Sequence, residues 1–285
     1  MATLLVLCRF LHFLAVLLMF GACVFRPVLL GNKPQPALDR QLARITTLLA
    51  WLAMGSGVAW LLLISASMAG RELLALDLAT VQLVLGKTFF GQVWSAHLLL
   101  NGLLVLGLLT PWSRLRLPLT VLLLATLAPV GHGAMLSGLN GQLLILNQVV
   151  HLLCVGAWLG GLLLLVLILR QAQRTALEEV LRRFSGVGYG LVTGLLISGL
   201  INVRVLTGQL WPTPLFSGFA LILLIKVLLV AGMLGLALLN RLRIKGCQQR
   251  PGQLQASVLL DWLLGAAAVA AVSLLGTLPP MLMAP

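Results

Sequence analysis

Long runs of apolar residues, separated by short polar segments, make up almost the whole chain of 285 residues. A helix needs about 20 consecutive apolar residues to cross the hydrocarbon core of a bilayer, and each run reaches that length. The pattern predicts an all-α fold, a polytopic membrane bundle of about eight transmembrane helices in a single membrane domain, 1–285. The predicted spans are 4–25, 43–69, 91–110, 116–136, 143–169, 184–206, 216–240 and 258–278.

The composition excludes an ordinary soluble protein. Hydrophobic residues make up 60% of the chain and charged residues only 9%, whereas soluble domains carry about 45–50% and about 25%. The cysteines show no Cys-x-x-Cys spacing, so the sequence predicts neither a disulfide framework nor a zinc knuckle. They are Cys8, Cys23, Cys154 and Cys247.

The net charge of +13 would suggest nucleic acid as a partner of a soluble protein. Here the basic residues lie in short loops between apolar runs, so no nucleic-acid partner is expected. Fourteen of the 19 Lys and Arg residues follow the first, third, fifth or seventh run. Because such residues concentrate in cytoplasmic loops, both termini are predicted to lie outside the cytoplasm. The fourteen are Arg26, Lys33, Arg40, Arg44, Arg114, Arg116, Arg170, Arg174, Arg182, Arg183, Arg241, Arg243, Lys245 and Arg250.

Histidines inside the apolar runs are the first candidates for chemistry, because polar groups are costly within a bilayer. On the predicted topology, all of them fall in the outer half of the membrane. They are His12, His97, His132 and His151. Two paired histidines on different helices could also hold a b-type haem, which leaves a haem-binding redox protein as the alternative function.

Sulfur-containing side chains lie one helical turn from two of these histidines. Cys8 precedes His12 by four residues, and Met135 follows His132 by three, so each pair shares a helix face. Imidazole, thiolate and thioether ligands suit copper better than magnesium or calcium. His97, close to Trp94, suits an anchor at the lipid headgroups as well as a ligand.

Two further charged residues lie within or beside the spans. Lys226 is about three turns inside its span, too deep to reach the headgroups, and is expected to face the bundle interior or a partner. Asp261 begins the last span, and Arg241 ends the preceding one at a similar depth. An ion pair between Asp261 and Arg241 is therefore expected.

Several segments, spread in order over essentially the whole chain, resemble the copper resistance protein D (CopD) family. They are Arg9-Phe10-Leu11-His12-Phe13, Gly131-His132, His151-Leu152-Leu153-Cys154, Ala157-Trp158-Leu159-Gly160-Gly161-Leu162, Arg183-Phe184-Ser185, Ser198-Gly199 with Asn202, Leu224-Ile225-Lys226 and Asn240-Arg241.

The resemblance implies copper transport across the bacterial inner membrane, from periplasm to cytoplasm, in copper homeostasis and resistance. It implies no enzymatic activity, and it implies a separate periplasmic copper-binding protein of the CopC type as a possible partner. Relatives often carry a second histidine four residues before the one in the fifth span, where this chain has Asn147.

Together, the residues and the resemblance predict a copper permease or copper-binding channel in the bacterial inner membrane, with periplasmic termini. The predicted copper site, for Cu(I) or Cu(II), lies in the outer half of the membrane. It is built from His12, His132 and His151, with Met135, Cys8 or His97 as auxiliary ligands.

Overall fold

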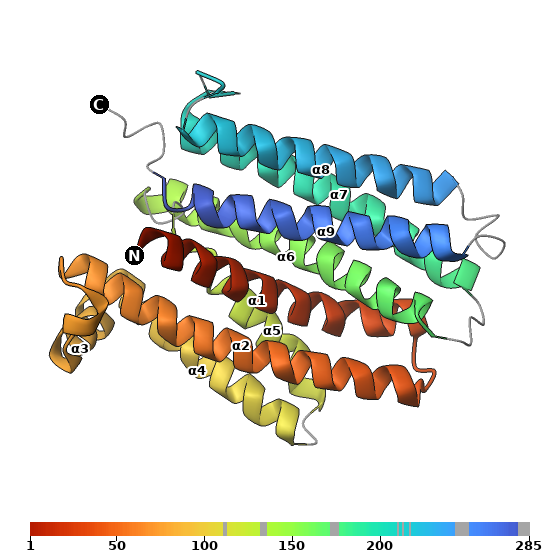
Figure 1. Ribbon diagram of the computed structural model, residues 1–285, viewed down its shortest axis with the longest axis horizontal. Coiled ribbons are helices and arrows are strands. Elements are labelled where there is room, and N and C mark those ends of the chain that lie inside the picture. Colours follow the sequence, from red (N-terminus) through yellow and green to blue (C-terminus); the bar gives the residue numbers. More distant parts are fainter. Residues whose placement is uncertain are drawn as a thin grey trace.

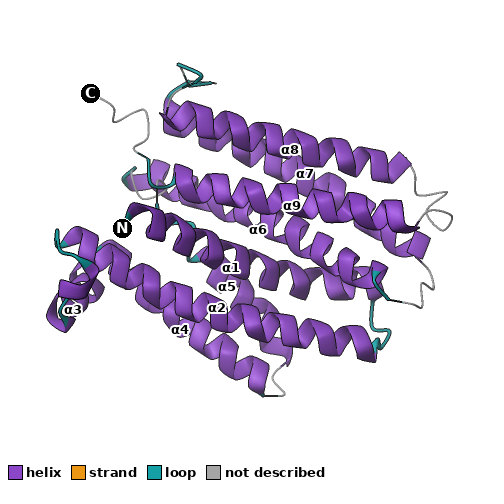
Figure 2. Ribbon diagram, in the orientation of Figure 1, coloured by secondary structure: helices purple, strands orange, loops and turns teal. Residues whose placement is uncertain are grey.

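The computed structural model describes residues 1–110, 113–131, 136–171, 177–209, 211–212, 214–216, 218–242 and 251–278. Helices and their connections account for this part of the chain, and it contains no strand (Figure 2). The predicted all-α membrane bundle is therefore confirmed. The α-helices are α1 (Ala2–Leu30), α2 (Pro36–Met68), α3 (Leu78–Lys87), α4 (Phe89–Leu109), α5 (Arg116–Ala125), α6 (Gly138–Leu169), α7 (Leu177–Thr207), α8 (Gly218–Leu242) and α9 (Pro251–Leu275).

Seven of these helices are long and apolar enough to cross a membrane, namely α1, α2, α4, α6, α7, α8 and α9. The remaining predicted span, 116–136, differs. Its helix α5 ends at Ala125, and ten residues rise only about 15 Å. The chain then continues in turns, in which the N–H of Ala128 donates to the carbonyl of Ala125 at 3.1 Å. Pro129 lacks an N–H and disfavours a helical residue before it, which explains the early end.

Helix α1 is the centre of the bundle and packs against α2, α5, α6, α7 and α9. In Figure 1, α2 and α4 lie on one side of α1, and α6 and α9 lie on the other, with α7 and α8 beyond them. Residues on α1 are accordingly enclosed on several faces. Two neighbouring positions on α1 can therefore face entirely different surroundings, which decides how the polar side chains group.

Helices α1 and α6 approach closely because both carry glycine at the crossing. A Cβ built on Gly21 would lie 2.0 Å from the carbonyl oxygen of Gly156, and one on Gly160 would lie 2.5 Å from the Cα of Gly21. Small residues of this kind let helix backbones meet inside a membrane. The crossing fixes the position of α1 relative to α6.

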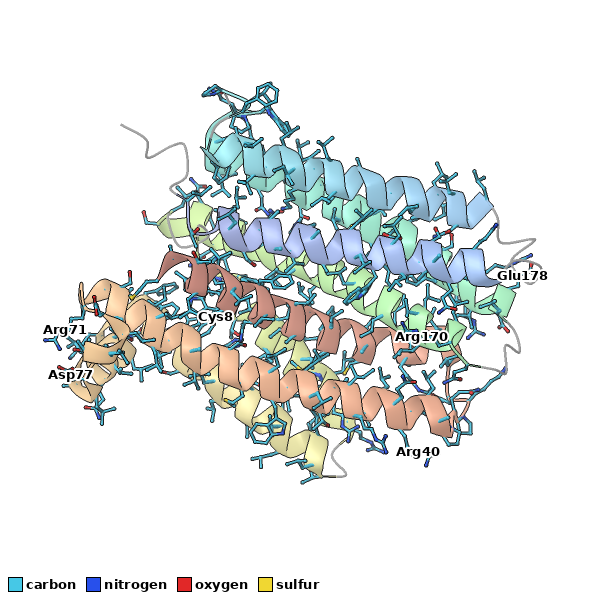
Figure 3. The ribbon with its side chains drawn as sticks, viewed as in Figure 1. Cys8, Arg40, Arg71, Asp77, Arg170 and Glu178 are labelled. Atoms are coloured by element: carbon cyan, nitrogen blue, oxygen red, sulfur yellow. The ribbon has the colours of Figure 1, made fainter. Side chains whose placement is uncertain are left out.

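The two ends of the bundle carry different parts of the chain. Helix α1 begins and α9 ends at the same end (Figure 1). Arg71 and Asp77 lie at that end, whereas Arg40, Arg170 and Glu178 lie at the opposite one (Figure 3). Because the chain starts and finishes at the same end of the bundle, it must pass from one end to the other an even number of times. Helix α5 and the turns after it therefore carry the chain back between α4 and α6.

Candidate metal centre

His12 on α1 and His97 on α4 meet inside the bundle. Both side chains are fully buried, and their Nε2 atoms lie 2.9 Å apart. The sequence-based site kept His97 as an auxiliary ligand and did not pair it with His12. The structure thus joins two of the predicted ligands in one place.

The other ring nitrogen of each histidine contacts a hydroxyl group. Nδ1 of His12 lies 3.0 Å from Oγ of Ser56 on α2, and Nδ1 of His97 lies 2.7 Å from Oγ1 of Thr126. Each hydroxyl donates its single hydrogen to a carbonyl one turn earlier, at 2.6 Å for Ser56 and 2.7 Å for Thr126. A hydroxyl bonded in this way can accept the Nδ1 hydrogen of its imidazole, and the same hydroxyl can rotate to donate to an unprotonated Nδ1, so its partners allow either tautomer.

In a neutral pair, one Nε2 carries a hydrogen and donates it to the lone pair of the other Nε2 at 2.9 Å, as two neutral imidazoles can. A metal ion would replace this hydrogen, because metal binding needs a lone pair on each Nε2 and places the ring hydrogen on Nδ1, facing the hydroxyl. Metal–imidazole bonds are about 2.0–2.1 Å long, so two nitrogens in line with one metal ion lie about 4 Å apart. A metal ion therefore needs the pair to open by about 1 Å.

Tryptophan rings enclose the pair. Trp94 stacks on His97 with ring centroids 4.7 Å apart and an interplanar angle of 11°, and Trp60 presents its edge to His12 at 5.6 Å. Trp94 also donates to the carbonyl of Gly57 at 2.9 Å. The rings hold both imidazoles in place and exclude water.

Two more polar residues lie one helical turn from the pair. The thiol of Cys8 donates to the backbone carbonyl of Ser56 at 3.0 Å, so in this structure it points to the backbone of α2. The buried amide of Asn101 has no hydrogen-bond partner among the residues that the structure describes. Among the described residues around the pair, the amide of Asn101 and the Nε1 of Trp60 both lack a hydrogen-bond partner.

His151 on α6 belongs to a different cluster. Its Nδ1 lies 2.9 Å from Oγ of Ser198 on α7, and its ring lines a cavity of about 200 Å³. On α1, Phe13 lines this cavity, whereas His12 turns toward α2 and α4. The structure therefore does not bring His151 to His12.

The remaining predicted ligands, His132 and Met135, lie outside the described residues. Within the described ranges, no group of three or more His, Cys, Asp or Glu side chains could hold a metal ion. Asn147, at the position where relatives carry a histidine, donates instead to Oδ1 of Asn202 at 2.9 Å and to the carbonyl of Ser198 at 3.0 Å.

Comparisons with known proteins identify the family. A family model described as "Copper resistance protein D-like, N-terminal domain" matches residues 1–142, and one described as "Copper resistance protein D" matches residues 178–275. The chain belongs to the copper resistance protein D family. It is a helical membrane protein of a copper-resistance family.

Two curated relatives match most of this chain of the copper resistance protein D family. "Inner membrane protein YebZ" of Escherichia coli (strain K12) is 29% identical over 283 residues, covering 95% of this chain and 97% of the relative. "Copper resistance protein D" of Pseudomonas syringae pv. tomato is 26% identical over 249 residues, covering 82% of this chain and 79% of the relative. No solved structure matches.

The matched regions of this CopD-family chain separate the two clusters. His12, Ser56, His97 and Thr126 all lie within the region that the N-terminal model matches. His151 lies between the two matched regions. Its partner helices α7 and α8 belong to the C-terminal one.

The ion pair expected between Asp261 and Arg241 is absent from the described part of the chain, and that prediction is wrong. Arg241 instead donates to the hydroxyl of Ser185, and its guanidinium lies 4.3 Å from the ring centroid of Tyr189. The Asp261 side chain is only 1% exposed, and its Oδ1 has no hydrogen-bond partner there. The Tyr189 ring and the Ser185 hydroxyl therefore contact the Arg241 guanidinium in place of the Asp261 carboxylate.

Proposed function

We propose that this protein binds copper between His12 and His97 and carries it across the inner membrane, from periplasm to cytoplasm, in copper homeostasis. The observation that carries the proposal is the contact of the His12 and His97 Nε2 atoms, 2.9 Å apart inside the bundle. Membership in the copper resistance protein D family supports the choice of metal.

The chemistry of the pair favours copper over hard cations. Magnesium and calcium take six or more oxygen ligands, which a tryptophan-walled pair of imidazoles does not offer. Copper accepts imidazole nitrogen, and Cu(I) tolerates two ligands in line. The hydroxyls on Nδ1 act as outer partners that fix each ring's direction, as is usual for metal-binding histidines.

The position of the pair fits loading from the outer side. His12 lies near the start of α1, at the end of the bundle where α9 also ends (Figure 1). The basic residues concentrate in loops at the other end, which favours a cytoplasmic location for that other end. Copper would then arrive from the periplasm, where a separate CopC-like protein is the proposed donor.

The haem alternative is less well supported by this geometry. Neither His12 nor His97 lines the cavity beside His151 or the second cavity beside Asp261. The contributions of His132 and Met135 to the copper site stay predictions.

The test is Cu(I) affinity of the purified full chain, measured by competition with a chromophoric chelator. His12→Gln and His97→Gln should each lose most high-affinity binding, whereas His151→Gln should keep it. X-ray absorption of the loaded protein should report nitrogen ligands at about 2 Å. Wild-type affinity in both folded His12→Gln and His97→Gln, or an intense Soret band in the purified protein, would refute the proposal.

The hydroxyl partners allow a finer test. Ser56→Ala should weaken Cu(I) binding about 10–100-fold, because loss of an outer partner frees the ring's direction. Ser65→Ala is the matched control, since Ser65 is buried on the same helix and its Oγ has no partner among the described residues. Equal affinities of the two variants would show that Ser56 does not position His12.

A further inference from the structure

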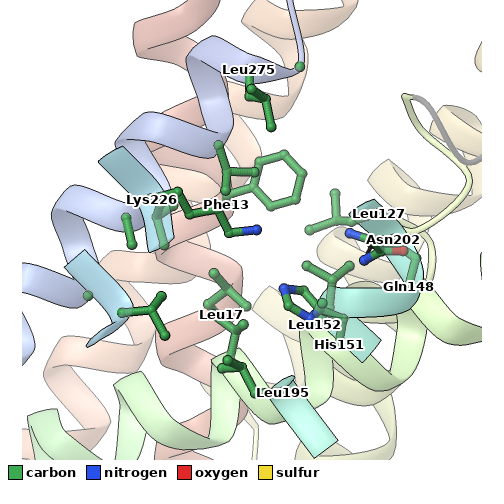
Figure 4. Close-up of a pocket in the computed structure, with 18 of the residues that line it drawn as sticks. Phe13, Leu17, Leu127, Gln148, His151, Leu152, Leu195, Asn202, Lys226 and Leu275 are labelled. Atoms are coloured by element: carbon green, nitrogen blue, oxygen red, sulfur yellow. Dashed lines mark hydrogen bonds between the residues drawn. The ribbon is translucent and has the colours of Figure 1, made fainter. Parts of the chain in front are cut away.

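The cavity beside His151 lies between helices α1, α6, α7, α8 and α9 and has a volume of about 200 Å³. Most of its lining is apolar. Figure 4 shows the Lys226 side chain extending into it from α8, with Gln148, His151 and Asn202 on the opposite side. The proposed copper site does not use this cavity.

The cavity holds two cations and no anion. Lys226 and Arg9 both line it, and neither has a hydrogen bond or an ion pair within the described residues. Arg9 is only 8% exposed, and its Nε has no partner there. Its guanidinium lies 4.9 Å from the ring centroid of Trp60. None of the chain's six acidic residues lines this cavity.

The amide and imidazole groups of the wall already have partners, whereas the Nε1 of Trp158, a donor, has none among the described residues. Asn202 donates to Oε1 of Gln148 at 2.8 Å and accepts from Asn147 at 2.9 Å, and His151 is held by Ser198. These amides therefore do not compensate Lys226 or Arg9. Lys226 and Arg9 are the charged groups of the cavity, and neither has a counter-charge in its lining.

Unpaired cations within a membrane are costly and mark a binding function. Their charge repels a second cation, which makes this cavity unsuitable for copper at His151. The same charge would stabilise an anion, since opposite charges attract strongly where water is excluded. A single anionic ligand would compensate the positive charges of both Lys226 and Arg9.

The size and lining of the cavity define the rest of the ligand. A cavity of about 150 Å³ with apolar walls is large enough for benzene, so about 200 Å³ admits a body of that size with one small charged group. We propose that this cavity binds an organic carboxylate on a compact apolar body, with its negative charge facing Lys226 and Arg9. Such an acid can come from the aqueous periplasm or, as the head of a fatty acid, from the bilayer.

The first experiment titrates the purified full chain with benzoate and with benzamide, its neutral counterpart, and follows binding by calorimetry. Benzoate should bind at least tenfold more tightly than benzamide. Lys226→Met and Arg9→Met should each weaken benzoate binding at least tenfold. Lys87→Met is the control, because Lys87 is exposed at the end of α3 and does not line the cavity.

A second arm uses laurate and distinguishes the sources. Tighter binding of laurate than of benzoate, with a fatty acid retained in native mass spectra, assigns the ligand to the bilayer. The reverse order assigns it to the periplasm.

Saturable binding of neither acid, equal affinities for benzoate and benzamide, or equal effects of Lys226→Met and Lys87→Met would overturn the proposal. Thermal unfolding checks that the Lys226→Met variant is folded. Because the substitution removes an unpaired buried cation, the variant should be at least as stable as the wild type. The Cu(I) affinity of this variant should equal that of the wild type. The carboxylate proposal and the copper proposal can therefore be refuted independently of each other.

Discussion

Substitution of Gly160 by alanine tests whether backbone contact between α1 and α6 holds the bundle together. A Cβ at this position would lie 2.5 Å from both Cα and the carbonyl carbon of Gly21. These are backbone atoms, which no rotamer change can move away. Ordinary contacts begin near 3.4 Å, so the two helices must separate by about 1 Å to accept one methyl group.

The expected cost follows from two opposing effects. Overpacking of a tight interface costs about 1–3 kcal/mol, whereas alanine gains up to about 1 kcal/mol over glycine in a helix interior. Inside a membrane, helix association depends on packing and not on a hydrophobic driving force. The lost contact is therefore not recovered elsewhere, and Gly160→Ala should be destabilising.

The assay is thermal unfolding of the purified protein in one detergent. Gly235→Ala on α8 is the matched control, because nothing lies within 4 Å of a Cβ at Gly235. Gly235→Ala should be as stable as the wild type or slightly more stable, and Gly160→Ala should unfold at a lower temperature. If both variants unfold at the same temperature, the close crossing does not hold α1 against α6.

Two further predictions concern the ends of the bundle. Asp77 is the N-cap of α3, and hydrogen bonds from Thr80 together with Arg71 lower its pKa from 3.8 to about 2. Because the folded pKa is depressed, the stabilisation of α3 should be complete above about pH 4 and lost as the pH falls through about 2; hydrogen exchange in α3 that shows no such dependence would contradict this. In a variant whose only cysteine is Cys247, a residue outside the described ranges, an impermeant maleimide should label opened membranes but not intact spheroplasts. Equal labelling would reverse the proposed topology.

The sequence predicted the long helices well because a membrane leaves few alternatives. Backbone groups in hydrocarbon must be satisfied within the segment, so seven apolar runs became seven long helices. The prediction of one continuous helix over 116–136 was wrong because hydropathy alone does not detect the effect of Pro129, which interrupts helical hydrogen bonding. Helix breaks of this kind are predicted from single residues such as proline, and not from the mean hydropathy of a segment.

The candidate site was only partly predictable, for a different reason. Helical spacing and charge gave the depth of the histidines, but not the faces of the helices that meet. Proximity in sequence favoured His132 with His151, a pairing that stays a prediction because His132 lies outside the described residues. Nothing in the sequence indicated the contact of His12 on α1 with His97 on α4. Ser56 and Thr126 were missed altogether, because a single hydroxyl residue in a helix carries no signal that it faces an imidazole.

The same contacts determine how the pair can open for a metal ion. Ser56 binds the ring of His12 from α2, and Thr126 binds the ring of His97 from the end of α5, so neither ring can swing aside without losing its hydrogen bond. An opening of about 1 Å must therefore come from the helices. Helix α4 packs against α2, α3 and α5, and it reaches α1 through the imidazole contact. Displacement of α4 together with Thr126, relative to α1 with Ser56, would open the pair and keep both outer hydrogen bonds, at the cost of stretching the bond from Trp94 on α4 to the carbonyl of Gly57 on α2.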